Sequence, residues 1–70
     1  MDKSKIGTIL EYSHGYYKVL ADDGEILYLV PWQIDSSIRT NKPIELVGYK
    51  GKLEFRKGPS YSLWYLTSIN

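Results

Sequence analysis

The sequence predicts a single small all-β domain, a five-stranded antiparallel barrel that occupies residues 1–70. Strand-forming residues are abundant, with seven tyrosines and two tryptophans among many Ile, Val and Leu. Turn signals recur at short intervals along the chain, and no window of helix length keeps a steady 3.6-residue apolar period. Together these observations favour short strands joined by tight turns.

The composition excludes several classes of small protein. The chain has 70 residues, no cysteine and one histidine, so it lacks a disulfide framework and the ligands of a zinc site. It is 43% hydrophobic and 24% charged, which is typical of a folded domain rather than a disordered one. We expect a domain that is stabilised by packing alone and that holds no metal or cofactor.

The start of the chain is polar. It reads Met-Asp-Lys-Ser-Lys without an early apolar stretch, and the longest apolar run, residues 26–30, is too short to cross a bilayer. We expect a soluble cytoplasmic protein with no membrane partner.

The first half of the chain predicts three strands. They cover residues 5–12, 16–21 and 25–30, and the last of them ends at a proline. Residues 13–15, Ser-His-Gly, form the first turn. Residues 22–24, Asp-Asp-Gly, close a hairpin, because Asp and Gly tolerate the positive φ angles of tight turns.

The middle of the chain predicts an exposed connection followed by a fourth strand. Residues 35–42 are polar and suit a crossing between sheets, with Ile38 as the apolar anchor. The fourth strand is expected from Pro43 or Ile44 to about Tyr49. A proline at a strand entry does least harm, because its missing N–H is not needed there.

Two interpretations of the next segment stay open. Gly51 makes a tight turn into a separate strand over residues 52–56, or the fourth strand bends through Gly48 and Gly51. Residues 57–60 form a turn in either case, and residues 61–69 form the last strand. The apolar pattern predicts a core of seven residues: Ile9, Val19, Leu27, Leu29, Ile44, Leu46 and Leu66.

Charge is distributed unevenly along the sequence. The net charge is only +1, which argues against a duplex-DNA binder that neutralises many phosphates. Residues 1–35 carry −3 and residues 36–70 carry +4. Strands from both halves interleave in a barrel, so this segregation suggests a basic face without establishing one.

The first three predicted strands resemble a known family. Residues 7–12 (Gly-Thr-Ile-Leu-Glu-Tyr), 14–19 (His-Gly-Tyr-Tyr-Lys-Val), 23–24 (Asp-Gly) and 28–34 (Tyr-Leu-Val-Pro-Trp-Gln-Ile) follow the order and spacing of a cold-shock domain. Residues 57–59, Lys-Gly-Pro, are similar to the turn before that family's last strand. The resemblance implies an OB-fold barrel that binds unpaired bases.

The resemblance also implies site residues. It makes Tyr16 and Tyr28 stacking rings and puts Tyr12 in place of the aromatic residue that ends the first strand. The departures from the family are Glu11 at a surface tryptophan position, Lys18 at an RNP ring position, Tyr17 in place of the glycine between the ring positions, and residues 30–31 in place of a His-Phe pair. Fewer surviving rings imply weaker binding.

The combination of tyrosines and basic residues also favours binding of single-stranded nucleic acid. Exposed tyrosines accept any base face, and interspersed cations follow the phosphates of a single strand. A basic turn at Arg56 and Lys57 offers two cations to a phosphate. The predicted partner is single-stranded RNA or DNA, bound with low sequence preference through Tyr12, Tyr16, Lys18, Tyr28, Arg56, Lys57 and Tyr61.

No catalytic apparatus is visible, so the chain is not expected to be an enzyme. His14 has no second histidine or nucleophile nearby. The acidic cluster Asp22, Asp23 and Glu25 is interpreted as a hairpin turn rather than a metal or acid–base site. No phosphate loop or nucleophile elbow occurs.

Two other readings remain open. The first is a protein-interaction module on the same barrel, with a degraded nucleic-acid face and docking through Trp32, Tyr49 and Tyr61. The second is a Tudor-like or KOW-like barrel, which shares the strand content but orders the sheet differently.

Overall fold

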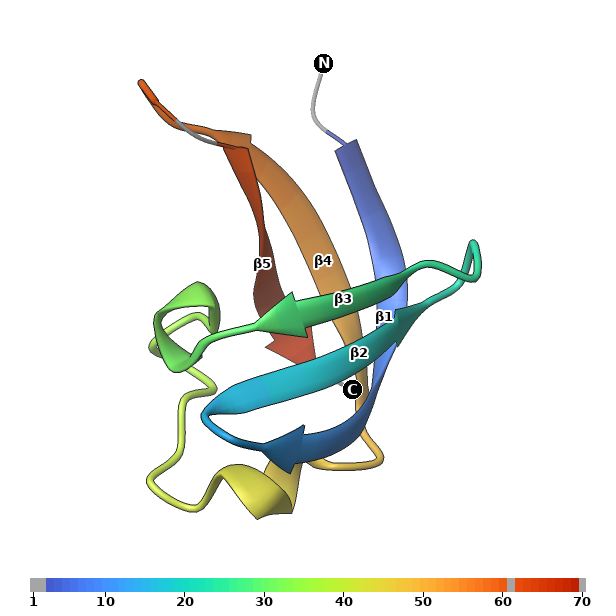
Figure 1. Cartoon of the computed structure of the whole chain (residues 1–70), viewed down its shortest axis with the longest axis vertical. Helices are drawn as coiled ribbons and strands as arrows, with labels where there is room; N and C mark the ends of the chain where they lie inside the picture. The colour runs from blue at the N-terminus through green and yellow to red at the C-terminus, as the bar shows by residue number, and fades with distance from the viewer. Residues whose placement is uncertain (1–2, 61, 70) are drawn as a thin grey trace.

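The structure, a computed structural model, describes residues 3–60 and 62–69. Within these residues five strands form one antiparallel sheet, together with two short 3-10 helices (Figure 1). The elements are β1 (Lys3–Ser13), β2 (Tyr16–Ala21), β3 (Ile26–Leu29), η1 (Pro31–Gln33), η2 (Pro43–Leu46), β4 (Lys50–Lys57) and β5 (Ser62–Ile69). The predicted all-β class is confirmed, and none of the described residues forms a helix that is long and apolar enough to span a membrane.

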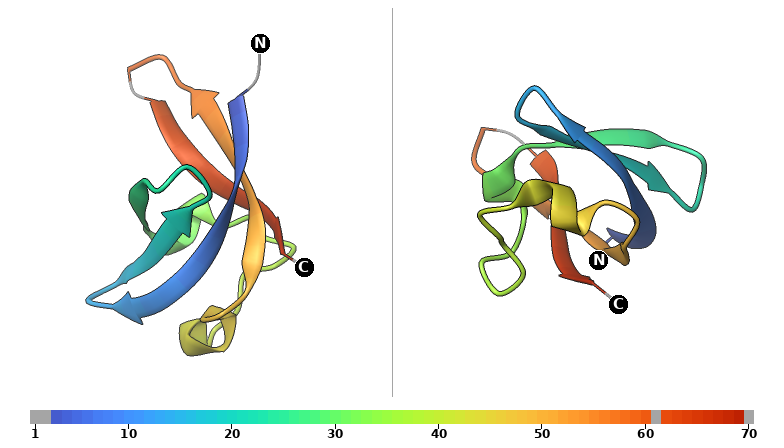
Figure 2. Two further views of the ribbon diagram at one scale, coloured as in Figure 1. Left: turned by 90° about the vertical axis from the view of Figure 1, so that its right-hand side faces the viewer. Right: turned by 90° about the horizontal axis from the view of Figure 1, so that it is seen from below.

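The sheet is an open OB-like barrel. Its strand order is β3-β2-β1-β4-β5, so the long strand β1 pairs with β2 on one side and β4 on the other. In Figures 1 and 2 the β2–β3 hairpin crosses the β4–β5 hairpin steeply, and the curved β1 belongs to both layers. A single parallel bridge between Ile34 and Leu66 brings the segment after β3 beside β5, but the sheet does not close.

Two glycines let β1 and β4 approach each other and bend. Gly7 and Gly51 lie directly opposite in the β1–β4 register. A Cβ atom at Gly7 would lie 2.6 Å from Val19 Cγ1 and 2.7 Å from Leu53 Cδ1. A Cβ atom at Gly51 would meet the backbone oxygen of Ser68, which cannot move without disturbing β5. Glycine at both positions allows the crossing that gives the barrel its curvature.

Both predicted tight turns are confirmed. His14 and Gly15 have φ angles of 53° and 82° between β1 and β2. Gly24 has a φ of 91°, and its N–H donates to the Ala21 carbonyl at 2.9 Å. Short polar side chains and glycine adopt this left-handed backbone most readily.

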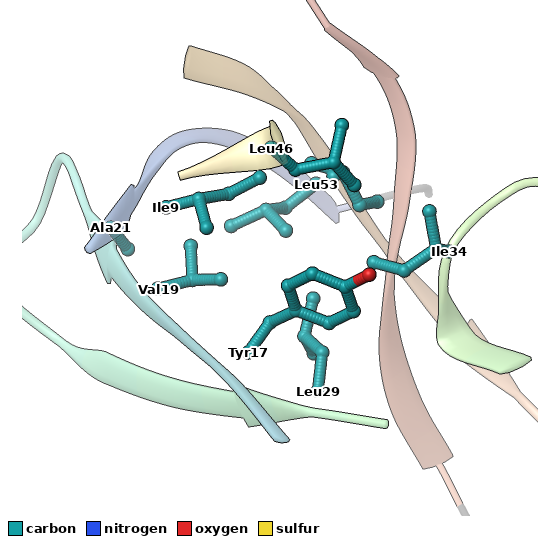
Figure 3. Close-up of a cluster of buried hydrophobic side chains, with 9 residues drawn as sticks. Ile9, Tyr17, Val19, Ala21, Leu29, Ile34, Leu46 and Leu53 are labelled. Atoms are coloured by element: carbon teal, nitrogen blue, oxygen red, sulfur yellow. The ribbon is translucent and has the colours of Figure 1, made fainter. Parts of the chain in front are cut away.

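The core lies between the two layers (Figure 3). Five of the seven predicted core residues are buried, namely Ile9, Val19, Leu29, Leu46 and Leu66. Leu27 is partly buried and packs against them, as does Ile38, the predicted anchor of the connection. The core also contains Tyr17, Ala21, Ile34 and Leu53, which were not among the predicted seven.

The predicted strand over residues 43–49 is wrong. Pro43 begins the 3-10 helix η2, a position where its fixed φ is favourable and its missing N–H costs nothing. Ile44 was predicted in the core but is 67% exposed, because the helical turn directs Leu46 inward instead. Gly48, with a φ of 97°, then reverses the chain into β4. Neither interpretation of Gly51 holds in full, because a separate strand does follow the turn, but the turn is at Gly48 and Gly51 lies within β4.

Candidate nucleic-acid interface

Three of the predicted site residues share the outer face of the β2–β3 hairpin. Strand β2 alternates, with Tyr17 and Val19 pointing into the core and Tyr16 and Lys18 pointing away from it. Tyr28 projects from β3 between the partly buried Leu27 and the buried Leu29. We call Tyr16, Lys18 and Tyr28 the tyrosine face.

The register places Lys18 next to both rings. Lys18 is directly opposite Tyr28, which corresponds to a Cβ separation of about 5 Å, and Tyr16 lies on the diagonal from Tyr28 at about 7–8 Å. Tyr16 is 48% exposed and Tyr28 is 61% exposed. Two open rings and one ammonium group are therefore presented together, and the flat rings are available for stacking.

The surroundings of the tyrosine face are mixed. Glu11 lies opposite Lys18 on the β1 side and reduces the positive potential there. The same outer surface continues with four aliphatic side chains that are 38–41% exposed, namely Ile6, Leu10, Leu20 and Ile26. The face is thus aromatic and apolar rather than strongly basic, with Lys18 beside the rings and Lys50 beside Ile6 and Leu20.

Tyr12 does not belong to the tyrosine face. The β1–β2 register shifts between Ile9 and Glu11, and one extra residue in a strand reverses the alternation that follows. Tyr12 consequently turns inward, pairs with Tyr17, and packs against it with ring centroids 4.8 Å apart. The structure places the Tyr12 ring in the core lining rather than on the proposed binding surface.

The basic turn is also separate from the tyrosine face. Arg56 lies with its guanidinium carbon 5.0 Å from the centre of the Tyr65 ring, and one of its nitrogens is 3.8 Å from a Glu54 carboxylate oxygen. Lys57 is exposed at the end of β4. Tyr61 lies outside the described residues.

A second cluster gathers where the segment after β3 meets β5. Trp32 in η1 is 54% exposed and meets Tyr65 edge to face, with ring centroids 6.2 Å apart. The two rings line a groove with Asp35, Arg39 and Arg56. We call these five residues the arginine groove. Its Tyr65 was not predicted, because the pairing of Trp32 with Tyr65 depends on the parallel bridge and not on a local pattern.

The arginine groove carries two cations and one anion. Arg39 donates to the Ile34 carbonyl at 2.9 Å, which fixes its guanidinium. The pKa of Asp35 is lowered, first because the Ser37 N–H and hydroxyl donate to its carboxylate, and further by the charges of Arg56 and Arg39. Asp35 is therefore ionised at neutral pH, and the groove holds a net charge of +1.

The acidic hairpin is used within the fold. Lys5 Nζ lies 3.0 Å from Asp23 Oδ2 and 2.6 Å from Glu25 Oε1. The same ammonium group is 4.5 Å from the centre of the Trp64 ring. Asp23 and Glu25 thus connect the β2–β3 turn to β1. Within residues 3–60 and 62–69 no group of three or more His, Cys, Asp or Glu side chains is arranged to hold a metal ion.

Comparisons with known proteins add no family to this description. No protein-family model, curated protein or solved structure matches the chain.

Proposed function

We propose that the protein binds single-stranded RNA or DNA with low sequence preference through the tyrosine face, and that it is a binding domain rather than an enzyme. The observation that carries this proposal is the joint exposure of Tyr16 and Tyr28 on one sheet face with Lys18 next to both. The strands β2 and β3 of OB-folds are a common platform for oligonucleotides. Such a role would place the protein in the cytoplasm.

The chemistry of the tyrosine face suits unpaired bases better than a duplex. Stacking requires the ring face of a base, which is accessible in a single strand and hidden in a double helix. A duplex would instead be held through many phosphates, whereas Lys18 faces Glu11 across the sheet and the net charge of the chain is +1. Low sequence preference follows, because every base offers a stacking surface.

The experiment is fluorescence anisotropy of a labelled pyrimidine oligonucleotide at low salt. Replacing both Tyr16 and Tyr28 by alanine should weaken binding by about 2–6 kcal/mol, because each stacked base contributes about 1–3 kcal/mol. Tyr49→Ala is the matched control, since Tyr49 is 45% exposed but lies in the segment between η2 and β4.

Two results would contradict the proposal. One is the absence of any binding by the wild type at low salt. The other is unchanged binding by the double variant when its circular dichroism spectrum shows that it is folded.

A protein-interaction module is the second candidate, and a specific observation favours it. The aliphatic residues Ile6, Leu10, Leu20 and Ile26 extend the tyrosine face, and nucleic acid gains little from such side chains. Contiguous exposed apolar surface is typical of a protein-binding site. The dependence of affinity on salt distinguishes the two candidates, because phosphate contacts weaken with added salt and apolar contacts do not.

A further inference from the structure

We propose that the arginine groove is a second subsite, in which one unpaired nucleobase stacks on Trp32 while Arg39 and Arg56 hold the adjoining phosphate. This inference rests on the proposed function, because it extends the binding path beyond the tyrosine face. It names residues that the cold-shock resemblance does not supply.

Hydrogen bonds hold the backbone segment that carries Trp32 in place. Gln33, which is 6% exposed, accepts from the Val30 N–H at 3.0 Å and donates to the Trp64 carbonyl at 2.9 Å. The Asp35 N–H donates to the Leu66 carbonyl at 2.8 Å. Gln33 thereby links the residue before η1 to β5, and a second contact attaches the segment after η1 to β5. A preorganised ring loses little conformational entropy when a base stacks on it.

Its aromatic neighbour Tyr65 leaves the exposed surface of the Trp32 ring uncovered. Tyr65 meets it at an interplanar angle of 60°, an edge-to-face contact that stabilises the orientation of the indole without covering it like a parallel stack. The Tyr65 ring is already in contact with Arg56, whose guanidinium carbon lies 5.0 Å from the ring centre. Of the two rings, Trp32 is the one that is available to a base.

The two guanidinium groups suit a phosphate. Arg39 uses one nitrogen for the Ile34 carbonyl and keeps its other N–H groups for a ligand. A guanidinium can donate two parallel hydrogen bonds to phosphate oxygens. Asp35 lies in the groove, and Glu54 lies 3.8 Å from Arg56, so these carboxylates limit the attraction to a single phosphate rather than a run of them.

The size of the groove limits its occupant. Its volume is about 210 Å³, below the range of about 300–1,000 Å³ that is usual for sites of drug-sized ligands. A single flat base is small enough to fit this space. An aromatic wall beside two arginines also matches the mixed stacking and charge of a nucleotide.

The arginine groove continues the tyrosine face along the chain. Trp32 follows Tyr28 by four residues, a span of at most about 13 Å. A strand that stacks on Tyr28 can therefore follow β3 toward its end and reach Trp32 near β5. The bound oligonucleotide then lies along β3. High-affinity binding needs an oligonucleotide that is long enough to reach both subsites.

The test uses the indole N–H signals of the full chain in two-dimensional NMR, with oligothymidylates of two, four and six nucleotides. Trp32→Phe assigns the two indole signals. We expect the longer oligonucleotides to shift the Trp32 signal and to leave the Trp64 signal in place. Trp32→Ala should weaken binding of the longest oligonucleotide by about 5- to 150-fold, whereas Trp32→Phe should retain most of the affinity.

The outcomes distinguish this inference from the proposed function. If the longest oligonucleotide binds and moves the amide signals of Tyr16 and Tyr28 while the Trp32 indole stays unchanged, the second subsite is refuted and the tyrosine face stands. The same conclusion follows if folded Trp32→Ala binds like the wild type. If no oligonucleotide moves any signal at low salt, the proposed function and this inference both fail.

Discussion

At the scale of single residues, Tyr17 shows how a side chain that resembles a binding ring serves the core. It is 1% exposed, and in Figure 3 its ring lies across the core with its hydroxyl toward Ile34. Burial raises the pKa of Tyr17, and the neighbouring Tyr12 adds to the effect. The fold therefore favours the neutral phenol over the phenolate.

This raised pKa predicts a loss of stability in alkali. As the pH rises past about 10, the ordinary pKa of tyrosine, the unfolded chain releases the Tyr17 proton before the folded chain does. Unfolding then becomes more favourable with each further rise in pH. Tyr17→Phe keeps the ring and removes this ionisation, so its urea midpoint should fall less than that of the wild type between pH 7 and pH 11.

Tyr49→Phe is the control for this measurement, because Tyr49 is 45% exposed and both variants retain every other group that titrates in alkali. An equal fall in midpoint for wild type and Tyr17→Phe would show that Tyr17 ionises as easily in the folded chain as in the unfolded one.

Residue placement could be predicted from the sequence only where strand alternation is unbroken. Tyr16, Lys18 and Tyr28 share one face, as simple alternation in β2 and β3 requires. Tyr12 does not, because the shift between Ile9 and Glu11 leaves no local signal in the sequence. Trp32 and Tyr65 meet only through the fold, so no local pattern could pair them.

At the scale of elements, Lys5 ties β1 to the β2–β3 turn. Its side chain is 11% exposed, whereas those of Asp23 and Glu25 are about half exposed. Partial burial alone would lower the pKa of Lys5, but the hydrogen bonds and charges of Glu25 and Asp23 outweigh it and raise the pKa. The pKa of Asp23 is lowered, first by the N–H of Glu25 and then by Lys5.

The two shifts define a pH window. The contribution of Asp23 is present above its unfolded pKa near 3.9 and is lost as the pH falls through the lower folded value. The contribution of Lys5 is present below about pH 10.4 and is lost as the pH rises through the higher folded value. The contact therefore stabilises the fold between about pH 4 and pH 10.

Lys5→Met keeps an unbranched stem near Trp64 and removes the charge. The free energy of unfolding of the wild type should rise relative to that of Lys5→Met as the pH is raised from 2 to 6. Lys52→Met is the matched control, because Lys52 is 51% exposed and lies 3.8 Å from its carboxylate partner, a geometry that contributes little. Parallel pH profiles for wild type and Lys5→Met would contradict the role of this contact.

Strands and turns could be predicted from the sequence where the turn residues determine the local backbone. The two hairpin turns were predictable, because His14, Gly15 and Gly24 carry the backbone angles that such turns require. Residues 43–49 were not, because Ile, Leu, Val and Tyr also favour a strand there. The outcome in this segment is decided by Pro43 at the start of η2 and by Gly48 after it.

At the scale of the whole molecule, the strand order keeps the two halves of the chain apart instead of interleaving them, so the charge segregation of the sequence is carried over to the sheet. The acidic first half supplies β1, β2 and β3, and the basic second half supplies β4 and β5, which meet β1 on one side and the segment after β3 on the other. The tyrosine face therefore lies on the acidic half. The arginine groove lies where the basic half approaches it.

The dependence of affinity on salt tests this arrangement and the choice between a nucleic-acid and a protein partner. Each phosphate contact to a single strand contributes a slope of about −0.7 to log affinity against log salt, so contacts from Lys18, Arg39 and Arg56 predict a slope near −2. Lys18→Gln should reduce the magnitude of this slope by about 0.7. Glu11→Gln should instead raise the affinity at low salt, because it removes the carboxylate opposite Lys18.

The two charge variants test the tyrosine face specifically, because Glu11 and Lys18 are neighbours in the register and carry opposite charges. Anisotropy of a labelled oligonucleotide across a salt series would measure wild type and both variants side by side. A protein partner docked on Ile6, Leu20 and Ile26 depends on apolar burial, which salt does not screen. An oligonucleotide affinity that stays constant across the series and responds to neither charge variant would contradict the phosphate contacts of Lys18, Arg39 and Arg56. The absence of any oligonucleotide binding at low salt would reject the nucleic-acid function in favour of the interaction module.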